Sequence, residues 1–156
     1  VRSKSLDSAV GGELLRFRRE CADLVQHLKV EVILFPAIGF FPGCGLVSEH
    51  ELGRTRVRNM AAAVDRWCAG DAEARKVFVR QAWSYLNLLR SHIAKEDGCL
   101  ANTCARTFST HDAERLAREF DELERREMGE GAFERFAGLV EALEGMVGPT
   151  TPSAQP

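Results

Sequence analysis

Three of the four histidines in this chain have a carboxylate close by, in segments with a helical pattern. Glu31 follows His27 by four residues, and Glu96 follows His92 by the same interval. Residues four apart lie on one face of an α-helix, so each pair would direct an imidazole and a carboxylate the same way. The third histidine, His50, lies between two glutamates. Nitrogen and oxygen ligands of this kind suit iron, manganese or zinc better than magnesium or calcium.

Each pair also has a simpler interpretation. A histidine and a glutamate four residues apart on a helix more often form a surface ion pair than a ligand set. Two such pairs together with His50 favour a metal site, in which facing helices would bring the side chains around one or two ions. The fourth histidine, His111, lies among Ser, Thr and Asp at an expected helix start, and we interpret it as a solvated residue without a role.

Helices are the elements that would position these side chains. Apolar residues recur at helical spacing almost end to end, and the alternation typical of strands is absent. We expect helices at about 7–38, 46–69, 71–104, 109–128 and 132–147, separated by glycine and proline. The expected N-terminal caps are Ser48 with Glu51, Asp71, and Ser109 with Asp112. The sequence therefore predicts an all-α protein.

The apolar stripes of these helices predict which faces are buried. The stripe of the 71–104 helix comprises Phe78, Trp83, Leu86, Leu89, Ile93 and Leu100. The stripe of the first helix comprises Leu14, Phe17, Cys21, Leu24, Leu28 and Ile33. The 109–128 helix alternates both charges around Leu116, Phe120 and Leu123, which is typical of a solvated helix packed lightly on a bundle; a partner-binding helix is the alternative.

Three long helices, each spanning more than about 30 Å at 1.5 Å per residue, have the scale of an up-and-down bundle. A closed bundle of this kind has four such helices, and the two C-terminal helices are too short and too charged to be an equal fourth member. The chain begins with Val1 rather than Met, which indicates either an alternative start or the loss of an N-terminal helix.

Composition narrows the class of protein. With 156 residues, 45% of them hydrophobic, we expect one domain over residues 1–147 and a disordered, proline-rich tail over 148–156. The net charge of -2 lacks the basic excess that nucleic-acid binding needs. No run of eighteen apolar residues and no secretory signal pattern is present, so we predict a cytoplasmic protein without a membrane span.

The cysteines are scattered and odd in number: Cys21, Cys44, Cys68, Cys99 and Cys104. None forms a C-x-x-C motif, so neither a disulfide framework nor a zinc ribbon fits. We expect reduced thiols.

The histidine segments resemble the hemerythrin-like HHE cation-binding family. Residues 48–54 (SEHELGR), followed by Val57, Arg58 and Met60, are similar to the third-helix signature of that family, and residues 85–97 (YLNLLRSHIAKED) to its last-helix motif. Residues 26–36 (QHLKVEVILFP) resemble the second-helix motif, in which histidines precede Lys-Glu-Glu and Leu-Phe-Pro. The resemblance runs from about residue 17 to residue 143.

This resemblance implies an up-and-down four-helix bundle with a non-haem di-iron centre, here lacking the first helix and carrying two short C-terminal helices. Members of the family bind oxygen, store or sense iron, or respond to nitric oxide and redox stress, and most are not enzymes. The implied partners are therefore an iron ion and O2 or NO. Carried over position by position, His50, His92 and Glu96 coincide with iron ligands of the family.

The second-helix motif departs from the family pattern. When it is anchored on residues 34–36, Gln26 and Val30 occupy the ligand positions, and His27 and Glu31 fall one residue later, a rotation of about 100° on a helix. Two outcomes remain open. If the helix turns by one position, His27 and Glu31 complete a site of three histidines and two carboxylates; otherwise only the three family ligands remain, with water in the open positions.

Two classes of function follow from these residues. The first is a metal-binding module of hemerythrin type with a weakened site, which senses or binds oxygen, iron or redox state. The second is a degenerate, metal-free bundle that acts as an interaction or scaffold protein. We do not expect an enzyme, because no nucleophile with its base is recognisable and the glycine-rich segment at 39–45 follows a helix and lacks the Lys of a phosphate-binding loop.

Overall fold

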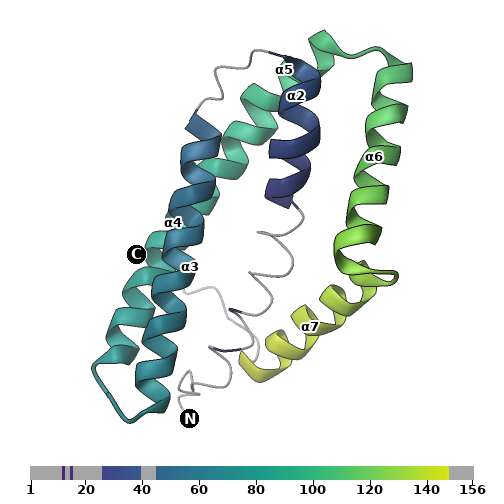
Figure 1. Cartoon of the computed structure of the whole chain (residues 1–156). Coiled ribbons are helices and arrows are strands. Elements are labelled where there is room, and N and C mark those ends of the chain that lie inside the picture. The colour runs from purple at the N-terminus through teal and green to yellow at the C-terminus, as the bar shows by residue number, and fades with distance from the viewer. Residues whose placement is uncertain (1–11, 13–14, 16–25, 40–44, 148–156) are drawn as a thin grey trace, which may run out of the picture.

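The computed structural model describes residues 12, 15, 26–39 and 45–147 (Figure 1). Regular structure in these residues is helical throughout, which confirms the all-α prediction. The elements are the π-helix η2 (Lys29–Leu34), α2 (Phe35–Ile38), α3 (Leu46–Cys68), α4 (Ala74–Lys95), the π-helix η4 (Glu96–Leu100), α5 (Ala101–Thr107), α6 (Thr110–Met128) and α7 (Ala132–Val147). Most of the expected first helix and the expected 148–156 tail lie outside the described residues.

A hairpin of α3 and α4 forms the main packing unit, and the two helices lie side by side in Figure 1. The turn between them contains Gly70 with φ 98°, a left-handed conformation that glycine adopts without steric cost. The buried cluster along the hairpin consists of Val57, Met60, Ala63 and Val64 from α3 with Phe78 and Tyr85 from α4. Leu15 packs against this cluster, so the N-terminal segment also contributes to the core.

Helix α6 packs against η2 on the side of the molecule away from the hairpin (Figure 1). Its predicted apolar stripe is confirmed, because Leu116 and Leu123 are buried and Phe120 is half-buried. The ammonium of Lys29 lies 2.5 Å from a carboxylate oxygen of Glu124 and 5.9 Å from the centre of the Phe120 ring. One lysine of η2 thus makes both an ion pair and a cation–π contact with α6.

Two of the predicted caps are confirmed in whole or in part. Ser109 and Asp112 form a reciprocal capping box at the start of α6. Asp71 accepts hydrogen bonds from the backbone N–H groups of Glu73 and Ala74 at the start of α4. The predicted cap at Ser48 is wrong, since α3 begins two residues earlier, after Gly45 with φ 79°.

The predicted inward stripe of the third helix is only partly correct. Phe78 and Leu100 are buried, but Trp83 is 58% exposed, Leu86 42% and Ile93 46%. The reason is geometric: five residues separate Phe78 from Trp83, and five residues of α-helix rotate by about 140°. The six residues therefore span two faces of α4, and only one of these faces α3.

The prediction that all cysteines are reduced is wrong for Cys99, which is disulfide-bonded. Cys68 and Cys104 are free thiols, as expected. Cys21 and Cys44 lie outside the described residues. Separately, none of the described helices is both long enough and apolar enough to cross a bilayer.

Replacing Phe78 by Ala should lower the free energy of unfolding by about 3 kcal/mol, because the ring is buried against α3 and its removal leaves a cavity. Trp83→Ala is the matched control on the same helix. Its exposed ring predicts a loss of less than about 1 kcal/mol. Urea denaturation followed by circular dichroism measures both, and equal losses would contradict this account of α4.

Candidate metal centre

Three histidines from three segments meet inside the protein. His27 precedes η2, His50 belongs to the second turn of α3, and His92 to the last turn of α4. Their relative exposures are 7%, 1% and 5%. Buried histidines need hydrogen-bond or metal partners, because an unpaired polar group in the interior costs several kcal/mol.

The three rings are in mutual contact. The rings of His27 and His50 stack with centroids 3.9 Å apart, and the His50 and His92 rings meet edge to face at 4.8 Å. One nitrogen from each of the three lies within 4.8 Å of the other two. The closest pair is Nε2 of His50 and Nε2 of His92, 3.2 Å apart. This is the one group of three such donors among the described residues that is close enough to share an ion.

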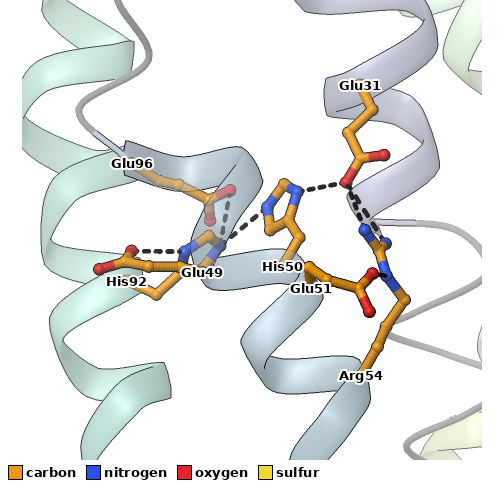
Figure 2. Close-up of polar contacts among 7 residues, drawn as sticks. All are labelled: Glu31, Glu49, His50, Glu51, Arg54, His92 and Glu96. Carbon is orange, nitrogen blue, oxygen red and sulfur yellow. Dashed lines mark hydrogen bonds and ion pairs between the residues drawn. The ribbon is translucent and has the colours of Figure 1, made fainter.

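The outer edge of His50 is held by a carboxylate (Figure 2). Its Nδ1 lies 2.6 Å from Oε1 of Glu31, and Arg54 donates to the same oxygen at 3.3 Å. Because a carboxylate accepts hydrogen bonds only, Nδ1 must carry a proton. In the neutral ring this leaves a lone pair on Nε2, the nitrogen that faces the other histidines.

His92 is held in the same way. Its Nδ1 lies 3.1 Å from Oε2 of Glu49, whose other oxygen accepts from Lys95. Its Nε2 points into the cluster and lies 3.3 Å from Oε1 of Glu96, as Figure 2 shows. Carboxylate–histidine pairs of this type fix the ring orientation of metal-binding histidines in many proteins.

These contacts impose a requirement for a cation. If both rings were neutral, the Nε2 lone pairs of His50 and His92 would face each other at 3.2 Å, with a carboxylate oxygen of Glu96 close by. Three electron-rich atoms in a buried space repel one another unless a proton or a metal ion lies between them. A proton on one of the two rings, or a metal ion between them, would remove this repulsion.

The pKa shifts show which ring takes the proton. Hydrogen bonding to Glu96 raises the pKa of His92, and the bond to Glu49 adds to this rise and outweighs the opposing effect of burial. Burial lowers the pKa of His50, helped by the nearby charges of His27 and His92, against the opposing bond to Glu31. Of the two rings, His92 is therefore the one that is more readily protonated, and its Nε2 lies within reach of both Glu96 and His50.

The spacing of the donors also fits a metal ion. Two ligands about 2.05 Å from one ion are roughly 2.9 Å apart at a right angle and roughly 3.3 Å apart at a tetrahedral angle. The separation of 3.2 Å between the Nε2 atoms of His50 and His92 lies in this range, whereas the donor atoms of the three histidines together lie within 4.8 Å of one another. A cavity of about 10 Å³, lined in part by all three histidines, adjoins them. That volume is about the minimum that one water molecule occupies.

In residues 26–39, the helix face that carries His27 is turned towards the histidine cluster. His27 is buried and the preceding Gln26 is exposed. Of the two registers left open by the sequence, the structure thus has the one that brings His27 and Glu31 to the cluster. Glu31, however, approaches the Nδ1 edge of His50 and not the Nε2 atoms at its centre.

Both helices that carry a candidate His–Glu pair leave α-helical geometry at the site. η2 begins two residues after His27 and contains Glu31, and η4 begins at Glu96. π-helical turns occur frequently at functional sites and shift the following residues away from their α-helical positions. An α-helical period therefore cannot predict the buried faces beyond these points.

Sequence reasoning missed the residues that orient the histidines. The sequence places Glu49 beside His50 but gives it no separate role, and Arg54 and Lys95 stand only within the longer motifs. The sequence did contain a signal for Glu49. Glu49 and Glu51 lie on either side of His50, and each step along a helix turns the side chain by about 100°, so one of the two glutamates must lie closer to α4 than the other. Glu49 is that residue, whereas Glu51 is exposed and pairs with Arg54.

Comparison of the chain with protein-family models, curated sequences and solved structures finds no significant match. The site must therefore be assessed on its own geometry.

Glu49→Gln should lower the free energy of unfolding by about 1 kcal/mol at neutral pH, since Glu49 binds both Lys95 and His92. Burial raises the pKa of Glu49, but the hydrogen bonds from Lys95 and His92 lower it more, so the folded value lies below 4.5. A lowered folded pKa means that the stabilisation is present above the unfolded pKa and is lost as the pH falls through the folded one.

The stability gap between wild type and Glu49→Gln should accordingly close as the pH is lowered from about 5 to about 2. Urea midpoints across this range measure it. Glu51→Gln on the exposed side of α3 is the control, with a smaller change at every pH. A gap that persists at the acid end would show that the charge on Glu49 is not the stabilising feature.

Proposed function

We propose that this protein is a helical module that binds one transition-metal ion through His27, His50, His92 and Glu96. The observation that carries the proposal is the 3.2 Å approach of two Nε2 atoms whose Nδ1 groups are both held by carboxylates. Imidazole nitrogens with a carboxylate oxygen form a ligand set for iron, manganese or zinc.

Within this proposal the carboxylates have two roles. Glu96 lies on the Nε2 side of His92 and completes the ligand set. Glu31 and Glu49 bind the Nδ1 edges of their histidines and act as orienting partners, each held by a cation of its own, Arg54 and Lys95. The loss of such orienting partners typically weakens metal binding 10- to 100-fold.

Iron is the ion that we infer for the site, on the strength of the hemerythrin-like motifs around His50 and His92. The same resemblance supports a bundle of hemerythrin type without its first helix, and O2 or NO as the small ligand. A bound ion would supply an electrophilic centre with coordination positions open to such a ligand. The described residues offer three histidines for this centre, which supports one ion rather than an iron pair.

A metal-free scaffold is the second candidate function. It is favoured by the way a single proton satisfies the cluster, because a protonated His92 can donate to His50 while both Nδ1 groups keep their carboxylates. In that case the cluster would serve stability alone, as a buried hydrogen-bonded network.

Titration of the purified, chelator-treated protein with Fe(II) under anaerobic conditions distinguishes the two. We expect one ion per chain, and we expect His50→Ala to weaken binding at least 100-fold, because it removes a buried ligand at the centre of the cluster. His111→Ala is the matched control, since this histidine is exposed on α6 and should bind nothing. Binding that is equal in the two variants would refute the assignment.

Metal should also raise the melting temperature. A ligand that binds only the folded state stabilises it by about 2.7 kcal/mol at a free concentration 100 times its dissociation constant. Differential scanning calorimetry with and without Fe(II), Mn(II) or Zn(II) tests this, and the ion with the largest shift identifies the preferred metal. A melting temperature that none of the three ions changes would support the metal-free scaffold.

A further inference from the structure

The outer face of α4 carries apolar side chains that α3 does not cover. Val79, Trp83, Leu86 and Ile93 are 38%, 58%, 42% and 46% exposed. They recur at intervals of four, three and seven residues, which places them along one side of the helix, away from Phe78, Tyr85 and His92 on the buried side. We call these four residues the α4 stripe. Four large apolar residues in one line are more than scattered surface exposure, and they mark an interaction surface.

The positive charge of α4 excludes a dimer in which two α4 stripes pack against each other. From Ala74 to Lys95 the helix has no Asp or Glu, and Arg75, Arg80 and Arg90 are exposed and form no ion pair among the described residues. Two α4 stripes packed against each other would place these arginines together, and like charges across an interface cost binding energy. The partner must therefore be an apolar helix with acidic residues.

Helix α7 of this chain has that chemistry. Its sequence AFERFAGLVEALEGMV is largely apolar, and its charged residues are Glu134, Glu141 and Glu144 with one arginine. That arginine, Arg135, donates to the backbone oxygens of Met128 and Glu130, and three glutamates against one arginine leave α7 with a net charge of about −2. Val140 is 37% exposed, one turn before Glu144.

The charges of the two helices also match in spacing. Ten residues separate Arg80 from Arg90, and ten separate Glu134 from Glu144. At 1.5 Å per residue both intervals are about 15 Å along the helix axis, and over each interval the helix rotates by about 280°, so the match is one of axial spacing. Within one chain α7 packs on α6, and Figure 1 shows it apart from α4.

We propose that the α4 stripe binds α7 of a second copy of this chain, in a twofold dimer in which each subunit gives α7 to its partner and receives the partner's α7. A twofold axis makes the two contacts identical and closes the assembly. Helices of 22 and 16 residues cover roughly 600 Å² per subunit at a width of about 10 Å. This is below the about 800 Å² of a standard interface, so the dimer forms in the micromolar range or above.

Sedimentation velocity of the full chain from 5 to 500 µM at low salt tests the proposal. The weight-average mass should rise from 17.3 kDa towards twice that value, and added salt should shift the transition to higher concentration. A mass that stays at the monomer value over the whole range at low salt overturns the proposal.

Charge reversal identifies the surfaces. Arg80→Glu/Arg90→Glu and Glu134→Arg/Glu144→Arg should each weaken dimerisation at least tenfold, and an equimolar mixture of the two variants should restore it, because both contacts of the mixed dimer then have opposite charges. Arg106→Glu/Arg118→Glu, two exposed arginines outside the α4 stripe, is the control of equal charge change. Circular dichroism checks that each variant is folded. Dimers unaffected by either reversal, or a mixture that stays monomeric, would refute the pairing of α4 with α7.

Discussion

The site depends on one electrostatic constraint, namely that the Nε2 atoms of His50 and His92 and a carboxylate oxygen of Glu96 lie close together while the Nδ1 atoms of both rings face other carboxylates. Both Nδ1 groups of His50 and His92 are committed to carboxylates, so the Nε2 atoms must face the interior. Their separation of 3.2 Å is too short for two lone pairs and suits a shared proton or ion. The proposed metal and the alternative metal-free network are two ways to satisfy this same condition.

The rest of the described structure holds these atoms in place. Helices α3 and α4 pack along one continuous apolar face, and that packing sets the distance between His50 and His92. Glu31 and Glu49 then fix the ring orientations, and Arg54 and Lys95 neutralise the two carboxylates at the edge of the cluster. The ion pair between Lys29 and Glu124 ties η2, which bears Glu31, to α6.

The same hairpin leaves one face of α4 uncovered. A helix in a closed bundle buries its apolar residues against neighbours on both sides, whereas α4 has α3 on one side and exposes Trp83, Leu86 and Ile93 on another. Basic residues lie around this face, and acidic residues outnumber basic ones on α7. Assembly and metal binding would thus use opposite faces of a single helix.

The sequence by itself determined the all-helical class, the ends of α3, α6 and α7 to within a residue or two, and the identity of the histidines. Those features arise from local spacing, glycine placement and side-chain chemistry, which are present in the printed order of residues. The exposure of Trp83 and the disulfide of Cys99 depend on which elements become neighbours, and the π-helical turns at the site have no sequence signal. The roles of Glu31 and Glu49 at the Nδ1 edges were decided by tertiary structure alone, because a hydrogen bond between helices needs a distance and a direction that neither helix specifies by itself.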